Sequence, residues 1–173
     1  AGETLEFDAA ILSVGVAGRV QGLGLEALGV TMNQGFVVVD ERQQTSVPGI
    51  YAIGDVAGAP CLAHKATHEA MIAAETIAGH FVQGLQRDRI PGCTYSFPQI
   101  ASIGLREQDA GDRALRIGRF PLYANGKAVV SGHTEGMIKT IFDSKTGALL
   151  GAHLIGDSVT ELIQGFTVAI GLE

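Results

Sequence analysis

The chain has 173 residues, of which 46% are hydrophobic and 17% charged, and its net charge is −6 at pH 7. This length suits one compact domain or parts of two, and the sequence lacks the basic patch of a phosphate-backbone binder, so nucleic acid is not an expected partner. Every apolar run stays below the ~18 residues that cross a bilayer, so no membrane partner is expected either.

In the first half of the chain, short apolar runs alternate with polar or Gly-rich turns. We expect strands at residues 7–16, 36–39 and 49–53, a helical turn at 25–28, and a helix at 62–78. Gly79 follows this Ala-rich helix directly and is a typical helix terminator. The small residues of the helix would allow close packing against a sheet or a ligand.

A polar stretch with Gly and Pro, residues 83–92, is the expected linker to a second module. Beyond it we expect two strands, a short helix, a turn and an antiparallel hairpin, followed by a last helix opened by a capping box of Ser158 and Glu161. The strands cover 100–105 and 115–123, the short helix 106–112, the turn 125–126, and the hairpin 137–142 and 148–155. Strands in series with helices on one side indicate an α+β module.

The most informative run is TSVPGIYAIGD, residues 45–55, which is followed by LAHKA, residues 62–66. An expected strand ends in Gly54 and Asp55, and a loop of small residues then leads to the helix. Open α/β sheets bind ligands outside the carboxyl ends of their strands, where a carboxylate can accept hydrogen bonds from vicinal hydroxyls. The simpler alternative is an ordinary Gly-Asp turn before a helix that only packs on a sheet.

These two runs resemble the second flavin-binding segment of the FAD-dependent pyridine nucleotide-disulfide oxidoreductases. Residues 95–104, YSFPQIASIG, resemble the opening of that family's interface domain, with Gln99 in place of the usual acid. The runs MIKTIF at 137–142 and GAHLIG at 151–156 continue the match. The resemblance therefore covers essentially the whole chain.

The resemblance implies a fold in three sections. Residues 1–24 would end the NAD domain, and residues 25–91 would form the C-terminal part of the FAD-binding domain, both of them doubly wound α/β structures. Residues 92–173 would form an α+β interface domain with an antiparallel sheet, truncated at its C-terminus. We therefore expect the chain to be a piece of a longer protein, which agrees with its start without Met.

The resemblance also implies two cofactor sites. Asp55 would accept hydrogen bonds from the ribityl chain of FAD, and the positive N-terminus of the following helix would face the edge of the flavin that carries negative charge when reduced. The expected FAD residues are Gly54, Asp55, Cys61, Leu62, Ala63 and His64. Gly18 matches the glycine that approaches NAD, whereas Arg19 departs from the family pattern and receives no role.

No residue of the chain is expected to be catalytic. The family's Cys-x-x-x-x-Cys redox disulfide, its Gly-rich FAD fingerprint and its His-Pro-x-x-x-Glu segment are all missing from these 173 residues. Cys61 and Cys93 do not have the spacing of a redox pair, so we expect reduced structural thiols. His64 and His68 have the i, i+4 spacing of zinc ligands but no evident third ligand, and no metal site is expected.

Within the family, LAHKA and the hairpin run favour the branch that oxidises protein-bound dihydrolipoamide with FAD and NAD⁺. That branch implies a homodimer, lipoyl domains of 2-oxo acid dehydrogenase complexes as partners, and a cytoplasmic or mitochondrial-matrix location. A sibling reductase of the mercuric or glutathione type remains an alternative. A second alternative is that the isolated chain is an inactive dimerisation module.

Overall fold

The computed structural model describes residue 2 and residues 4–172. The chain forms two compact units, Ala1–Leu85 and Gln86–Glu173, and their boundary lies inside the predicted linker at 83–92. The further division of the first unit at residue 24 stays a prediction. No helix in the described part of the chain is both long and apolar enough to cross a membrane.

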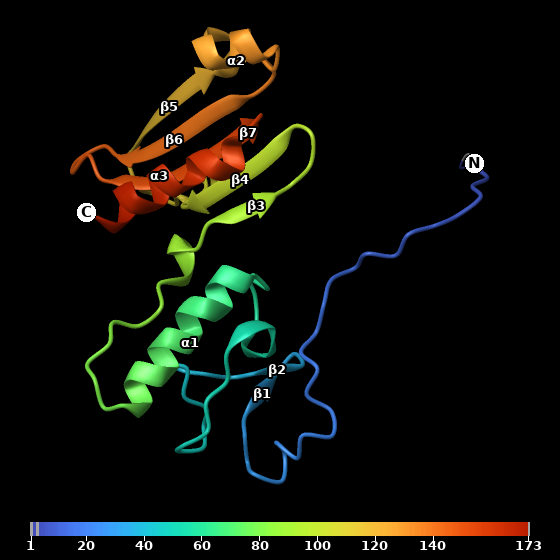
Figure 1. The fold of residues 1–173 in the computed structure, drawn as a ribbon, viewed down its shortest axis with the longest axis vertical. Helices are drawn as coiled ribbons and strands as arrows, with labels where there is room; N and C mark the ends of the chain where they lie inside the picture. The colour runs from blue at the N-terminus through green and yellow to red at the C-terminus, as the bar shows by residue number, and fades with distance from the viewer. Residues whose placement is uncertain (1, 3, 173) are drawn as a thin grey trace. The chain divides into compact units, whose positions relative to one another are not determined.

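The first unit contains little regular structure besides one helix (Figure 1). Its elements are strands β1 (Met32–Asn33) and β2 (Phe36–Val37), the 3₁₀ turn η1 (Gly54–Ala57), and helix α1 (Ala63–Ile77). Two single-residue bridges, Val39 to Thr45 and Gln44 to Tyr51, hold the segment between β2 and η1. A small core around Val20, Val30 and Val37 packs beneath these turns. The predicted helix is confirmed, and its last turn ends beside Gly79 with a φ of +79°.

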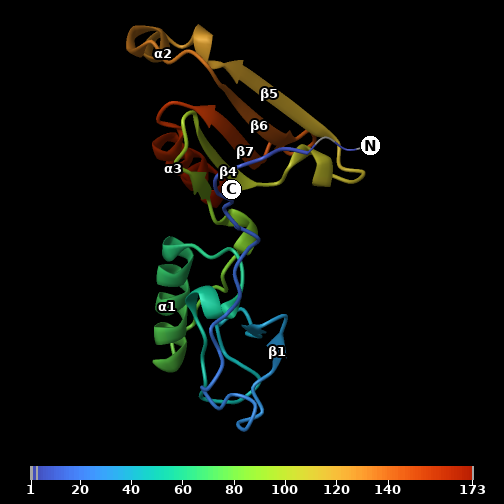
Figure 2. The ribbon, with the colours of Figure 1, turned by 90° about the vertical axis from the view of Figure 1, so that its right-hand side faces the viewer.

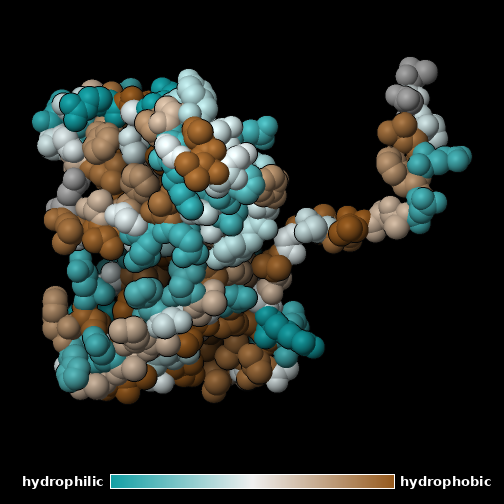
Figure 3. Space-filling model, turned by 45° about the horizontal axis from the view of Figure 1, so that its top comes forward, coloured by the Kyte–Doolittle hydropathy of each residue, from teal (hydrophilic) through white to brown (hydrophobic). Residues whose placement is uncertain are grey.

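The strand predicted at 7–16 is wrong for this chain, because the segment has no regular structure and is exposed throughout. Ile11 is 95% exposed, and Figure 3 shows the apolar side chains of this segment as brown atoms open to solvent. A buried strand needs neighbouring strands to bond its N–H and C=O groups. No described segment of the chain pairs with it.

The strands predicted at 36–39 and 49–53 are only partly formed. β2 ends at Val37, and in the second run only Tyr51 pairs as a bridge residue. The Ala52 N–H donates to the Gln43 carbonyl at 3.1 Å, and the Thr45 N–H donates to the Ile50 carbonyl at 2.9 Å. These bonds turn the chain back on itself over a few residues, which leaves no length for a continuous ladder.

The second unit is a five-stranded antiparallel sheet in the order β3-β4-β7-β6-β5. The strands are β3 (Gly92–Thr94), β4 (Gln99–Gly104), β5 (Leu115–Pro121), β6 (Met137–Asp143) and β7 (Leu149–Gly156). The predicted hairpin of β6 and β7 is confirmed, with a register shift between Ile141 and Phe142. The predicted α+β class of this unit is confirmed as well.

Helix α3 (Val159–Gly171) covers one face of this sheet, in front of β4 and β7 in Figure 1. Its buried residues Val159, Ile163 and Ile170 recur at helical spacing and meet the apolar residues of the strands. The strand residues of this core are Ala101, Ile103, Leu149, Ala152 and Leu154. The core of the second unit therefore lies between α3 and the centre of the sheet.

Short helical segments lie between the strands and differ from the sequence expectation. They are η2 (Arg87–Arg89), η3 (Glu107–Asp109), η4 (Leu122–Ala124) and α2 (Gly126–Ser131). The helix predicted at 106–112 is reduced to η3. The turn predicted at 125–126 instead opens α2, because the Asn125 side chain accepts a hydrogen bond from the Ala128 N–H at 3.1 Å and caps the helix.

The predicted capping box at the start of α3 is wrong. Ser158 has a left-handed φ of +59° and makes no side-chain cap, whereas capping requires an extended backbone at this position. Gln99 of β4 replaces it. The Gln99 side-chain oxygen accepts hydrogen bonds from the Thr160 N–H at 3.3 Å and from the Thr160 hydroxyl at 2.9 Å.

Candidate functional site

The first unit places the η1 turn directly against the first turns of α1, as both Figure 1 and Figure 2 show. Gly54 opens this turn with a φ of +72°, a conformation that glycine adopts without strain. A Cβ at this position would lie 3.5 Å from the Cβ of Ala66 on α1, which is ordinary contact. Gly54 is therefore required by its backbone conformation and not by lack of space.

A buried ion pair on α1 holds the turn in place. The side chains of Lys65 and Glu69 are both 0% exposed, and the Lys65 Nζ lies 3.1 Å from the Glu69 Oε1. The Lys65 ammonium donates to the carbonyls of Gly54 and Gly58, each at 2.9 Å, and the Glu69 Oε2 accepts from the Gly54 N–H at 2.7 Å. Both backbone polar groups of Gly54 are thus bonded to this one pair.

Asp55 follows immediately and is exposed. Its backbone carbonyl accepts from the Gly58 N–H at 3.1 Å, which closes the turn. Within the part of the chain that the structure describes, no hydrogen bond or ion pair engages the Asp55 carboxylate. This carboxylate is consequently available to accept hydrogen bonds from a polar ligand.

The other predicted FAD residues lie at the start of α1. Cys61 and Leu62 are half-buried, and Ala63 and His64 are exposed. Leu62 is the residue before the helix, makes no side-chain cap, and no acidic side chain lies in the first helical turn. The start of α1, which has no side-chain cap from Leu62 and no acidic residue in its first turn, and the Gly54–Asp55 turn belong to elements in contact, an arrangement that suits an anionic or hydroxyl-rich ligand.

Gly18, the predicted NAD residue, is buried in the first unit and lies against the turn between β1 and β2. A Cβ at this position would lie 2.5 Å from the carbonyl oxygen of Gly35. Close packing of two backbone segments is therefore one sufficient reason for glycine here. The contribution of Gly18 to an NAD site stays a prediction.

Sequence reasoning missed Lys65 and Glu69 as determinants of this site. A signal was present, because Lys65, Glu69 and Ala73 recur every four residues and form the buried stripe of α1. Opposite charges on a stripe that otherwise carries alanine are typical of a buried pair. The two histidines considered as zinc ligands, His64 and His68, are both exposed, and the described residues contain no group of three or more metal-binding side chains.

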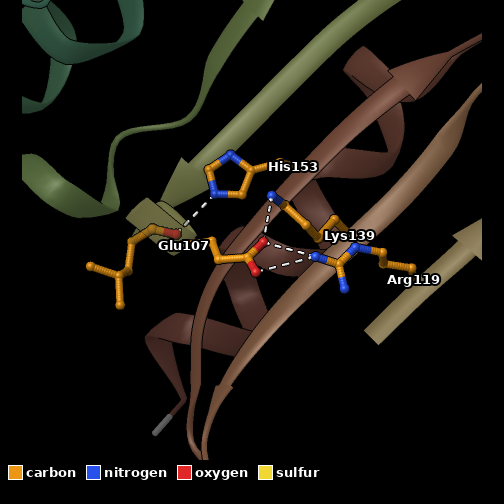
Figure 4. Close-up of polar contacts among 5 residues, drawn as sticks. Glu107, Arg119, Lys139 and His153 are labelled. Atoms are coloured by element: carbon orange, nitrogen blue, oxygen red, sulfur yellow. Dashed lines mark hydrogen bonds and ion pairs between the residues drawn. The ribbon is translucent and has the colours of Figure 1, made fainter. Parts of the chain in front are cut away.

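The second unit carries a polar cluster on the sheet (Figure 4). Glu107 accepts from Arg119 at 2.9 and 3.2 Å and from Lys139 at 3.2 Å, and a His153 ring nitrogen lies 2.9 Å from the Leu105 carbonyl. The hydrogen bond from Lys139, and then the Arg119 and Lys139 charges, hold the pKa of Glu107 below its ordinary value. Because the carboxylate is matched by cations and the groups are largely solvated, this is a surface ion-pair network.

Both cysteines are free thiols, and neither is exposed fully. The Cys93 Sγ lies 4.0 Å from the Thr160 carbonyl, between β3 and α3. Burial, and then the charge of Glu161, raise the pKa of the Cys93 thiol. A raised pKa lowers the fraction of thiolate at neutral pH, which agrees with a structural role for Cys93.

Comparisons with known proteins assign the two units. Residues 1–70 match the family described as pyridine nucleotide-disulphide oxidoreductase, and residues 90–173 match the dimerisation domain of the same family. The chain is 56% identical over 174 residues to a dihydrolipoyl dehydrogenase of Rhizobium etli, covering 99% of the chain. It is 53% identical over 170 residues to that of Zymomonas mobilis, covering 96%. The chain spans 36% of the length of each of these relatives.

Solved structures agree. LpdA from Mycobacterium tuberculosis superposes with a TM-score of 0.90 at 31% identity, covering 98% of this chain and 38% of LpdA. The HOCl-induced flavoprotein disulfide reductase RclA from Escherichia coli superposes with a TM-score of 0.81 at 26% identity, covering 91% of this chain and 37% of RclA. The two family matches leave only residues 71–89 outside them. The chain belongs to the pyridine nucleotide-disulphide oxidoreductases, and its second unit is their dimerisation domain.

Proposed function

We propose that this chain is a section of a dihydrolipoyl dehydrogenase that uses FAD and NAD⁺. The observation that carries this proposal is the sequence identity of 53–56% to two proteins of that name over nearly the whole chain. The Gly54–Asp55 turn supports it, because an exposed, unpaired carboxylate lies beside an uncapped helix N-terminus. When bound, FAD would carry electrons from the thiol substrate to NAD⁺.

The residues present fit the flavin cofactor. Asp55 would accept hydrogen bonds from its ribityl hydroxyls, and Gly54 would allow the close approach of the turn. Cys61 and Leu62, which precede α1, and Ala63 and His64, which open it, would face the flavin edge largely through their backbone. The positive end of the helix favours negative charge there and would therefore stabilise the reduced state.

Residues 1–24 would close an NAD domain with Gly18 near the nucleotide, residues 25–91 would belong to the FAD domain, and residues 92–173 would supply the dimer interface of a homodimer. Lipoyl domains of 2-oxo acid dehydrogenase complexes would be the partners. A cytoplasmic location is proposed because the relatives from Rhizobium etli and Zymomonas mobilis are bacterial, with the mitochondrial matrix as the alternative.

The likeness to RclA favours one second candidate, a sibling disulfide reductase. The experiment is to purify the protein from its full-length coding sequence and to assay NAD⁺ reduction by dihydrolipoamide. Glutathione disulfide and Hg(II), each with NADPH, serve as competing substrates. Activity with dihydrolipoamide and none with the competitors supports the proposal, whereas the reverse pattern assigns the protein to a sibling branch.

The flavin site is tested with Asp55→Asn. We expect the dissociation constant of FAD to rise about tenfold, because a neutral amide accepts hydrogen bonds more weakly than a carboxylate. Asp112→Asn is the matched control, since Asp112 is an exposed aspartate of the second unit. An equal loss of FAD affinity in both variants would show that Asp55 does not contact the cofactor.

A further inference from the structure

We propose that Lys65 and Glu69 are positioning residues, which lock the turn at residues 54–58 so that Asp55 is held toward the cofactor. The inference rests on the proposed flavin site and deepens it. Neither side chain can contact a ligand directly, because both are 0% exposed. They act through the backbone of the turn, which they contact at three points.

The lock is specific to the turn. The Lys65 ammonium donates to the Gly54 and Gly58 carbonyls and forms an ion pair with the Glu69 carboxylate. The Glu69 Oε2 accepts one hydrogen bond from the Gly54 N–H at 2.7 Å. The two ends of the turn are therefore tied to one ammonium group, and the residue before Asp55 is fixed at both of its polar backbone atoms.

Stability alone does not account for such a pair. Moving two charges out of water is costly, and apolar side chains of similar volume often stabilise a protein as well or better. The pair lies on the stripe of α1 that otherwise buries Ala73, where apolar residues would fit the pattern of the helix. What apolar side chains cannot supply is the set of hydrogen bonds to the Gly54 and Gly58 backbone.

The consequence for the cofactor follows from geometry. Gly54 adopts a φ of +72°, in the left-handed region that residues other than glycine rarely adopt. Asp55 is the next residue along the chain. With the Gly54 peptide bonded on both sides, the direction of the Asp55 carboxylate relative to the start of α1 is set before any ligand binds. Such preorganisation lowers the entropic cost of binding.

The test uses the full-length protein with both residues replaced, Lys65→Met together with Glu69→Leu. This change removes one positive and one negative charge, so the net charge and long-range field stay the same. We expect the variant to fold, as judged by circular dichroism and a cooperative thermal transition. In titrations of the apoprotein, its dissociation constant for FAD should be higher by about tenfold or more. The visible spectrum of bound flavin at saturating FAD should also change, which a simple loss of stability would not cause.

Amide hydrogen exchange on the apoprotein measures, without FAD, how firmly the turn at residues 54–58 is held. Exchange at residues 54–58 should become faster in the double variant and stay unchanged in Glu75→Gln, a control at an exposed position of the same helix. Should the double variant not fold, Glu69→Gln gives the same readouts with a smaller change.

The outcomes separate the two proposals. Wild-type protein that binds FAD, with the double variant within twofold of it, overturns the lock and leaves the flavin function standing. Unchanged exchange at residues 54–58 also overturns it. Wild-type protein that binds no FAD overturns the proposed function and, with it, the positioning role.

Discussion

Among single residues, Gly104 and Gly111 share a left-handed backbone but differ in their surroundings. Gly104 has a φ of +74°, and a Cβ there would lie 2.2 Å from the Leu150 carbonyl oxygen. Gly111 has a φ of +56° and open space around it. We expect Gly111→Ala to cost about 1 kcal/mol from backbone strain, and Gly104→Ala to cost about 3 kcal/mol or more because backbone atoms must also move. Urea unfolding measures both, and equal costs would contradict the steric part.

Glu107 gives a pH-dependent prediction. Its pKa in the folded protein is lowered from the ordinary 4.5, chiefly by the hydrogen bond from Lys139. The unfolded state therefore binds the proton more readily, so the stabilisation is present above pH 4.5 and is lost as pH falls through the lower folded value. Glu107→Gln should lower stability at pH 7 and flatten this acid-side loss in urea melts.

The matched control for this change is Glu135→Gln, at an exposed carboxylate with no ion pair among the described residues. It should leave the pH dependence of unfolding unchanged. Added salt should shrink the effect at Glu107, because the pair is solvated. An equal response of the two variants would mean that the Glu107 network contributes nothing to stability.

At this scale, the sequence indicates the proposed FAD residues but not the contacts that hold them in place. Asp55 is recognisable because its position after a short apolar run and before a helix is a local pattern. The role of Lys65 and Glu69 depends on which side of α1 is buried and on the path of the turn, and neither is local. The face of small residues expected on the helix is only partly buried, since Ala63 and Ala74 are exposed.

At the scale of elements, the start of α3 is capped by a side chain of strand β4. Gln99 occupies the position where the family motif carries an acid, and its oxygen meets the second residue of the helix. Gln99→Glu should raise stability at pH 7 by about 0.5 kcal/mol, since a negative charge near a helix N-terminus is favourable. Gln99→Leu should cost about 1 kcal/mol by removing the acceptor.

Thermal or urea unfolding of the two Gln99 variants checks this prediction. The gain from glutamate should disappear at acid pH, where the carboxyl is protonated and no longer charged. A glutamate variant less stable than wild type at pH 7 would show that repulsion by Glu161, in the first turn of α3, outweighs the helix dipole.

Elements with strong periodicity and local partners were predictable, as α1, α3 and the β6–β7 hairpin show. The strand predicted at 7–16 did not form for a physical reason. Apolar runs of this kind predict strands, but a strand forms only where other strands bond it, and sequence pattern does not say whether those partners are in the same chain. The capping role predicted for Ser158 was wrong for a related reason, because the residue that caps the helix, Gln99, is distant from it in the sequence.

At the scale of the whole molecule, the two units differ in how much of their apolar surface they bury. The second has its own sheet, helix and core, whereas the apolar segment at 7–16 of the first pairs with no strand among the residues that the structure describes. The chain spans 36% of the length of the two relatives described above, so the proposed FAD residues would form only part of a complete FAD site. The central claim is therefore that the Gly54–Asp55 turn and the start of α1 form one side of a flavin pocket in a longer enzyme.

The measurement that tests this claim most directly is the visible spectrum of the protein purified from its full-length coding sequence, taken with its intact mass. The account predicts flavin absorbance bands and a mass well above the 18.0 kDa of these 173 residues. A full-length product that shows no flavin absorbance, even after FAD is added, would contradict it.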